Sequence, residues 1–147
     1  MSEIWRCDSC GKDINSVEAG WVEWLRDRDS DKYYGMRIVH HDEKCMYNDR
    51  YEHFENNNSV LDMHLSSFYS QDGHISLLEL ISDGQFKNND EVLEVIKRLF
   101  IPDYEVARLY FRDAISEGYF EPNTKENYHH TLDIQRTMDY IRHEGIN

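Results

Sequence analysis

The chain has 147 residues, of which 39% are hydrophobic and 13% aromatic, which excludes a disordered chain and allows one ordinary domain or two small ones. Its formal net charge is -13, and residues 1–58 and 59–147 are both acidic, with 8 Lys and Arg against 13 Asp and Glu in the first part and 8 against 16 in the second. This charge argues against broad nucleic-acid binding and against an anionic membrane surface, and it favours a protein partner with a basic surface.

The sequence contains no segment typical of a membrane or secreted protein. No apolar run approaches the ~20 residues that cross a bilayer, and the N-terminus lacks the charged and apolar regions of a secretory signal. The three cysteines are an odd number, which suits metal binding in a reducing compartment better than a disulfide framework. We therefore expect a cytoplasmic protein.

The first motif in the chain is a C-x2-C pair, formed by Cys7 and Cys10 and followed by Gly11. Two intervening residues allow one tight turn to direct both sulfur atoms at one ion, and a glycine eases the backbone through that turn. A redox-active C-x-x-C normally begins a helix that follows a strand. The segment before Cys7 is too short for that arrangement, so the pair predicts metal binding.

A β-hairpin is predicted next. Residues 20–25 and 33–39 are rich in aromatic and β-branched residues, and a polar segment joins them. Alternation places Trp21 and Trp24 on opposite faces of the first strand, so both faces require cover. Because a two-stranded hairpin cannot supply that cover alone, we expect it to pack on the rest of the chain.

Two adjacent histidines and the third cysteine follow the hairpin. If a helix begins near Asp42, His41 and Cys45 are separated by about one turn and can converge on one ion, whereas His40 gives the longer H-x4-C spacing. The predicted ligands are Cys7, Cys10, His41 and Cys45, with His40 as the alternative histidine ligand. Four protein ligands leave no open position for water, so we expect one structural Zn²⁺ per chain.

These motifs also carry a resemblance. Three parts of the sequence carry it: the series Trp5-x-Cys7-x2-Cys10-Gly11, residues 20–24, and residues 37–45 with their tandem histidines. Together they resemble an N-terminal Cys3His zinc module of small uncharacterised bacterial and phage proteins. The resemblance covers about the first third of the chain. It implies a treble-clef or ribbon-like zinc module and implies no particular activity, because such modules occur in adaptors, nucleic-acid binders and nucleases.

Residues 59–147 are predicted to be helical, after a joint at the asparagine triplet 56–58. Apolar residues recur at helical spacing between Gly, Pro and cap-like residues. The predicted helical segments are 59–68, 75–82, 89–100, 103–117 and a last helix from about Thr131. We therefore predict an α+β protein in which a zinc-bound β-hairpin module (1–55) packs on a helical C-terminal domain of four to five helices (59–147).

One alternative function is a winged-helix-like DNA-binding regulator. The helices after residue 75, followed by a possible strand at 128–131, imitate a helix-turn-helix with a wing. The recognition helix would be 104–117, but it offers only Arg108 and Arg112 to phosphates.

A second alternative is an HNH-like metal-dependent nuclease that would use His40 or His41 together with Asn48 and His53. One tandem histidine is already assigned to zinc, and a second C-x2-C pair is missing. No serine-nucleophile or P-loop motif occurs, so we assign no catalytic residue. The preferred function is a protein-interaction or regulatory module of the kind that bacteria and phages encode, with the partner and the oligomeric state left open.

Overall fold

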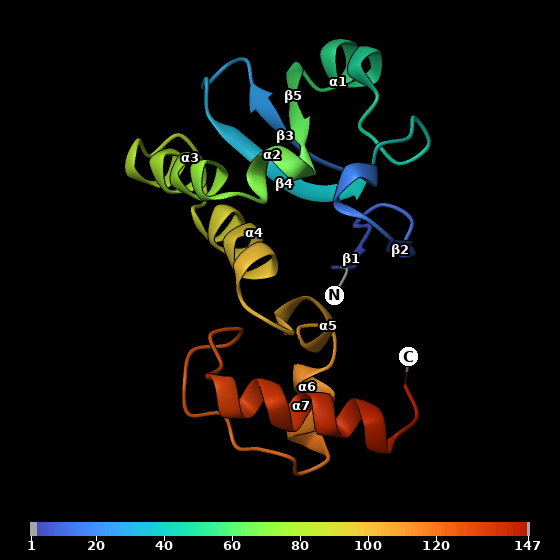
Figure 1. Cartoon of the computed structure of the whole chain (residues 1–147). Helices are drawn as coiled ribbons and strands as arrows, with labels where there is room; N and C mark the ends of the chain where they lie inside the picture. Colours follow the sequence, from blue (N-terminus) through green and yellow to red (C-terminus); the bar gives the residue numbers. More distant parts are fainter. Residues whose placement is uncertain (1–2, 147) are drawn as a thin grey trace. The chain divides into compact units, whose positions relative to one another are not determined.

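The computed structural model describes residues 3–146 and has an α+β fold. Within that range the chain forms seven α-helices, one short 3-10 helix and two small antiparallel sheets (Figure 1). The chain divides into two compact units between Phe100 and Ile101. Each unit has its own hydrophobic core and is described separately below.

The first unit is built around a three-stranded antiparallel sheet with the order β4-β3-β5. Its strands are β3 (Gly20–Asp27), β4 (Tyr33–His40) and β5 (Asn58–His64). The first two confirm the predicted hairpin, and Trp21 lies opposite Val39 across it. β3 is the central strand and pairs along both of its edges, with β4 and with β5.

A second, two-stranded sheet lies at the N-terminus. It pairs β1 (Trp5–Arg6) with β2 (Asp13–Ile14) and is followed by the 3-10 helix η1 (Val17–Ala19). Trp5 and Ile14 are opposite each other in this pair and are both buried. The loop between the two strands carries the C-x2-C motif, so the buried pair fixes the base of that loop.

Four helices complete the first unit. They are α1 (Asp49–Glu55), α2 (Leu65–Phe68), α3 (Gln71–Ser82) and α4 (Asp90–Phe100). Trp24 of β3 packs against Phe68 of α2, with ring centroids 6.0 Å apart. Leu77 of α3 and Val92 and Val95 of α4 belong to the same core. Helices α2 to α4 thus supply the cover that one face of the hairpin requires.

The structure corrects the predicted segment 59–68. Residues 58–64 form strand β5, and only Leu65–Phe68 are helical. The apolar spacing of Leu61, Leu65 and Phe68 is compatible with a helix, but pairing with β3 provides hydrogen bonds along the whole of β5. Asn56 and Asn57 therefore connect α1 to β5, and Asn58 is the first residue of the strand. The chain divides into units near residue 100 instead.

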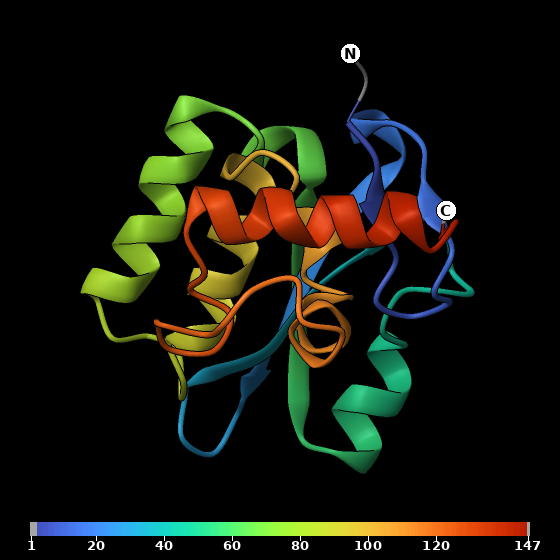
Figure 2. The ribbon, with the colours of Figure 1, turned by 90° about the horizontal axis from the view of Figure 1, so that it is seen from below.

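The second unit is helical. It contains α5 (Tyr104–Ala107), α6 (Phe111–Ser116) and α7 (Thr131–His143), which is the long red helix of Figure 2. Its core includes Phe111, Phe120 and Ile134. The predicted helix 103–117 is interrupted between α5 and α6, and no strand forms anywhere in the described residues 101–146.

None of the helices in the described part of the chain is both long and apolar enough to cross a membrane.

Candidate metal centre

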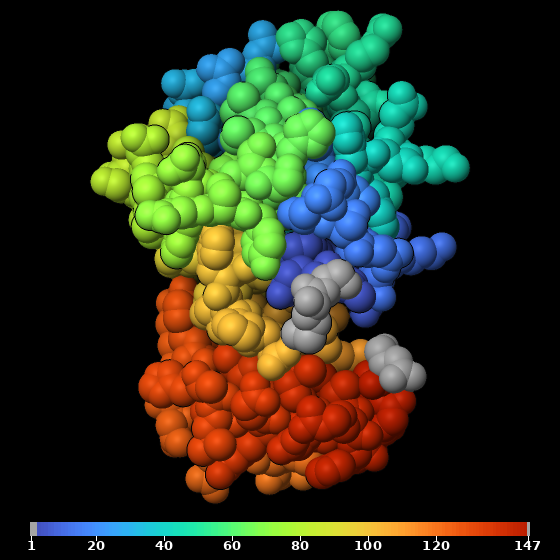
Figure 3. Space-filling view, in the orientation of Figure 1, coloured from blue at the N-terminus to red at the C-terminus, as the bar shows by residue number. Residues whose placement is uncertain are grey.

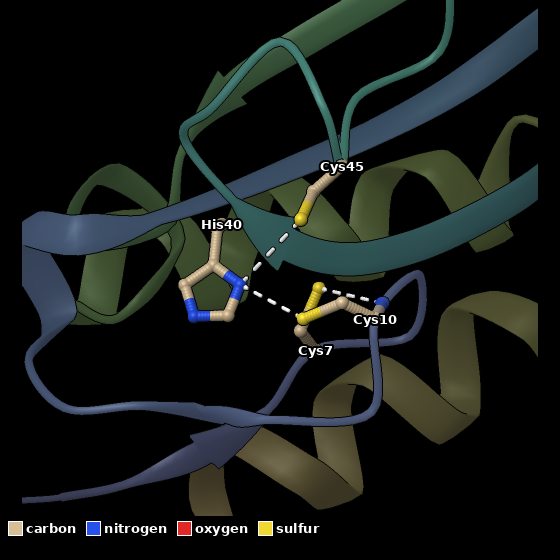
Figure 4. Close-up of side chains that lie close together, drawn as sticks. All are labelled: Cys7, Cys10, His40 and Cys45. Atoms are coloured by element: carbon tan, nitrogen blue, oxygen red, sulfur yellow. Dashed lines mark hydrogen bonds between the residues drawn. The ribbon is translucent and has the colours of Figure 1, made fainter.

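Four side chains from three separate segments meet in the first unit. Cys7 and Cys10 come from the loop after β1, His40 ends β4, and Cys45 lies in the turn that follows (Figure 4). Their ligand atoms, three sulfurs and one imidazole nitrogen, all lie within 4.8 Å of one another. This arrangement could hold a metal ion.

The C-x2-C loop has the geometry of a tight turn. The Cys10 backbone N–H points at the Cys7 Sγ at 3.5 Å, and the Gly11 N–H donates to the Cys7 carbonyl at 3.0 Å. Gly11 has a φ of 77°, in the left-handed region that glycine adopts without a Cβ penalty. The predicted role of Gly11 in turning the backbone is therefore confirmed.

His40 directs its Nδ1 atom towards the sulfurs. Nδ1 lies 3.4 Å from the Cys10 Sγ and 3.7 Å from the Cys45 Sγ. On the other side of the ring, Nε2 lies 2.9 Å from the Asp13 carbonyl oxygen. A carbonyl oxygen can only accept, so the Nε2–H donates and the Nδ1 lone pair is left for a metal.

The structure places His41 elsewhere, and the preferred histidine of the predicted ligand set must be replaced by the alternative, His40. The His41 ring stacks on Trp21 with centroids 4.1 Å apart and planes 6° apart, and it meets His64 edge-on. The spacing argument assumed a helix from Asp42. Residues 42–45 instead form a turn, in which the Cys45 N–H donates to the Asp42 carbonyl, and α1 begins only at Asp49.

The surroundings of Cys7 and Cys45 shift the pKa values of their thiols in opposite directions. Burial raises the pKa of Cys45 to about 11, and the neighbouring sulfurs of Cys7 and Cys10 act in the same direction. Burial also acts to raise the pKa of Cys7, but hydrogen bonds from backbone groups of Cys10, His40 and Ser9 outweigh it and lower this pKa to about 6. A bound cation would remove the conflict between adjacent thiolates, because it stabilises all of them at once.

An aspartate inside the C-x2-C loop anchors it to the rest of the unit. Asp8 Oδ2 accepts hydrogen bonds from the Ile38 N–H at 2.8 Å and from Arg98 Nη1 at 2.7 Å. Arg98 also donates to the Arg6 carbonyl at 2.9 Å, and the Trp5 indole N–H donates to the Arg98 carbonyl. The loop is thereby tied to β4 and to α4. Sequence reasoning missed this anchor because the partners are 90 residues apart.

A buried ion pair supports the turn that carries Cys45. Glu23 is 1% exposed, and its carboxylate lies 2.7 Å from Arg37 Nε and accepts from the Tyr47 N–H. Arg37 Nη2 also donates to the Cys45 carbonyl at 3.0 Å. Burial raises the pKa of Glu23, against the effect of these donors. The pair therefore fixes the backbone on both sides of Met46, and no sequence motif indicated it.

The residues of the nuclease alternative have partners of their own, in α1 and directly after β3. Asn48 caps α1, where its side chain accepts from the Tyr51 N–H at 2.9 Å. His53 contacts Arg28, with Nη1 and Nδ1 2.6 Å apart.

The two arginines of the DNA-binding alternative are engaged within the second unit. Arg108 Nε donates to Glu105 at 2.9 Å, and Arg112 forms an ion pair with Glu126 at 2.6 Å. Because α5 and α6 are separate short helices, the expected recognition helix is not continuous.

The chain matches no protein-family model, and neither the comparison with curated proteins nor that with solved structures gives a significant match.

Proposed function

We propose that Cys7, Cys10, His40 and Cys45 bind one structural Zn²⁺ in a treble-clef or ribbon-like module. The proposal rests on the convergence of four donor atoms within 4.8 Å. Thiolate and imidazole donors in a set of four suit tetrahedral Zn²⁺, while Mg²⁺ and Ca²⁺ prefer oxygen ligands. With four protein ligands the ion has no open position for a reacting water.

The ion would stabilise the fold by joining three segments at one centre, in addition to the hydrogen bonds of Asp8, Glu23 and His40 that already connect them. It would hold the loop after β1, the end of β4 and the turn at Cys45 together, and Cys7 and Cys45 are already buried there. Since an unfolded chain offers no preformed site, binding energy at such a centre contributes directly to folding.

The metal content of the purified protein tests this proposal. We expect one zinc per chain by elemental mass spectrometry, with the metal lost in Cys45→Ser. Ser9→Ala is the matched control, because Ser9 lies in the same loop and its side chain is not a donor in the cluster. A folded wild-type protein that contains no zinc, and takes none up when it is supplied, would contradict the assignment.

For the zinc-bound protein we propose a role as a protein-interaction or regulatory module with a partner that presents a basic surface. The net charge of -13 supports this role, as do two large side chains of α1 that remain exposed, Tyr51 (57%) and Phe54 (71%). Opposite charges accelerate association and select partners, whereas exposed aromatic side chains contribute affinity.

Affinity capture with a paired variant tests the interaction role. The wild type and a Tyr51→Ala/Phe54→Ala double variant are used as bait at low and high salt. We expect a defined protein that the wild type retains, that salt weakens and that the double variant retains poorly. Salt-sensitive binding of duplex DNA in a gel-shift assay, without any such protein, would contradict this role and favour the DNA-binding alternative.

A further inference from the structure

Strand β5 forms an outer edge of the three-stranded sheet. The Arg28 N–H donates to the Asn57 carbonyl, and the register continues from Asp27 opposite Asn58 to Trp21 opposite His64. Hydrogen-bonded and non-hydrogen-bonded pairs alternate along an antiparallel ladder. The residues of β5 that bond to β3 are therefore Ser59, Leu61 and Met63. Those whose backbone N–H and C=O groups point away from β3 are Asn58, Val60, Asp62 and His64.

No other strand of the described chain pairs with this outward edge. Atoms of β5 and α1 lie at the surface on the face seen in Figure 3, where both segments are green. A row of outward N–H and C=O groups can template a further strand.

A hollow of about 320 Å³ lies beside the first half of this edge. It is lined by Asp49, Arg50, His53 and Phe54 of α1 and by Asn58, Ser59 and Val60 of β5. Asn58, Ser59 and Val60 are consecutive on β5, so the hollow follows the first half of this strand beside α1. The hollow can therefore accept a side chain from a segment that pairs with β5.

The charged residues around the outer edge of β5 restrict which kind of segment can pair with it. Helix α1 and strand β5 together expose three acidic residues, Asp49, Glu55 and Asp62, and one arginine, Arg50. The remaining acidic side chain, Glu52, is buried and accepts hydrogen bonds from neighbouring asparagine side chains. A second copy of the chain would bring the same negative charge to the interface. An added strand that carries Lys or Arg would instead meet opposite charge.

We propose that the outer edge of β5 binds an extended, basic segment of a partner protein by strand addition, with one apolar side chain of that segment in the hollow beside Phe54. The proposal rests on the interaction role proposed above and specifies its surface. Backbone hydrogen bonds to Val60 and Asp62 give the affinity, and the hollow and the acidic residues give the selectivity.

Peptide binding tests the chemistry of the edge. The probe is a peptide of about seven residues, the length of β5, in which Lys alternates with Val. Its control has the same sequence with N-methyl groups on alternate residues, which removes backbone donors along one edge and keeps every charge. We expect NMR shifts of the Val60 and Asp62 amides on binding of the first peptide, and binding at least about tenfold weaker for the N-methylated one. Equal binding of both would overturn the proposal, because it would show attraction by charge alone.

A proline scan of the strand tests the direction of its hydrogen bonds. In Val60→Pro the outward donor is lost while the bonds from Ser59 and Leu61 to β3 remain, and proline is tolerated on that side of an edge strand. Val60→Thr is the matched control. We expect peptide binding about tenfold weaker in the proline variant and nearly unchanged in the threonine variant. If the proline variant does not fold, Asp62→Lys provides the second test, with weaker binding of the basic peptide expected.

Two further outcomes distinguish the proposed strand addition at β5 from the broader protein-interaction role. If a captured partner binds Val60→Pro and Asp62→Lys as well as it binds the wild type, the edge proposal is overturned and the interaction role stands. If the wild type forms a concentration-dependent dimer that Val60→Pro abolishes, the occupant is a second copy and the proposal of a basic partner is overturned. Zinc content is measured in each sample, so a damaged metal centre is recognised independently.

Discussion

The Nε2 atom of His40 lies 2.9 Å from the carbonyl oxygen of Asp13. This contact connects the end of β4 to β2 and leaves the Nδ1 atom facing the sulfurs of Cys10 and Cys45. A histidine ligand is commonly oriented by such an outer hydrogen bond. The backbone of β2 therefore orients the ring of His40 and determines which of its two ring nitrogens faces the cluster.

The two histidines should differ sharply when each is replaced. His40→Ala removes one of four donors and should weaken zinc binding by at least about 100-fold, while His41→Ala should leave it within about threefold of the wild type. Competition with a chromophoric chelator measures both affinities. His41→Ala also removes the ring stacked on Trp21, so its folding is checked by circular dichroism. Equal losses in the two variants would contradict the assignment of His40.

Removal of the metal should loosen the C-x2-C loop first. The Asp8 N–H donates to the Ile38 carbonyl at 2.8 Å, and we expect a chelator to accelerate hydrogen exchange at this amide by at least about tenfold. The amide of Glu144, which donates to Tyr140 at the end of α7, serves as the internal control in the second unit. Uniform acceleration at both amides would indicate global unfolding instead of a local effect.

Lys87→Met should change the stability of the first unit in acid. Lys87 Nζ lies 2.8 Å from Asp27 Oδ2, and this contact, helped by the Asp29 N–H, lowers the pKa of Asp27 to about 2. A carboxylate with a depressed pKa in the folded state stabilises the protein above its unfolded pKa near 4, and that contribution disappears as the pH falls through about 2.

The variant should therefore be less stable than the wild type at pH 5 and 7, with the difference shrinking below pH 4 and vanishing near pH 2. Urea denaturation across this range measures the effect, and carboxyl NMR should show the pKa of Asp27 rising towards its ordinary value. Lys44→Met, which removes an exposed charge far along the chain from Asp27, is the control. A difference between Lys87→Met and the wild type that is independent of pH would contradict this explanation.

Gly73→Ala should destabilise the first unit severely. Gly73 is buried in the first turn of α3, where a Cβ would meet the backbone Cα and carbonyl oxygen of Phe68 at the end of α2. Backbone atoms cannot move aside as a flexible side chain can, so we expect a loss of at least about 2 kcal/mol in the free energy of unfolding. Ser76→Ala, an exposed position on the same helix, should be neutral or slightly stabilising. Denaturant unfolding compares the two, and a Gly73→Ala protein as stable as Ser76→Ala would refute the predicted clash.

Local patterns were sufficient for part of this fold. The aromatic and β-branched segments gave β3 and β4, and Gly84 and Pro102 marked the ends of α3 and α4. The start of α3 was placed four residues late, because Gly73 lies inside the helix that begins at Gln71. The C-x2-C pair and Cys45 were recognised because a sulfur cluster uses residue types that are rare elsewhere in the chain.

The remaining features depend on long-range pairing that spacing does not encode. Trp21 and Trp24 showed that β3 needs cover on both faces, but only the sheet register shows that β5 lies beside it. The choice between His40 and His41 likewise depends on how β4 ends opposite Gly20 and on the turn that replaces the expected helix at Asp42. A short apolar segment such as 59–68 satisfies helix and strand patterns equally well. Whether it becomes a strand therefore depends on whether another strand is available to pair with it.

The contact between Asp8 and Arg98 has a consequence for how the protein is made. A ribosome delivers residues 7–10 long before α4, which supplies the guanidinium that neutralises Asp8 and bonds to the Arg6 carbonyl. Cys7 and Cys10 would therefore wait for His40 and Cys45 to be synthesised, and their loop would lack its anchor until Arg98, 90 residues after Asp8, has been made. We expect the nascent N-terminal thiols to be open to oxidation or to foreign metals during this interval, and to become protected only once α4 has emerged and docked.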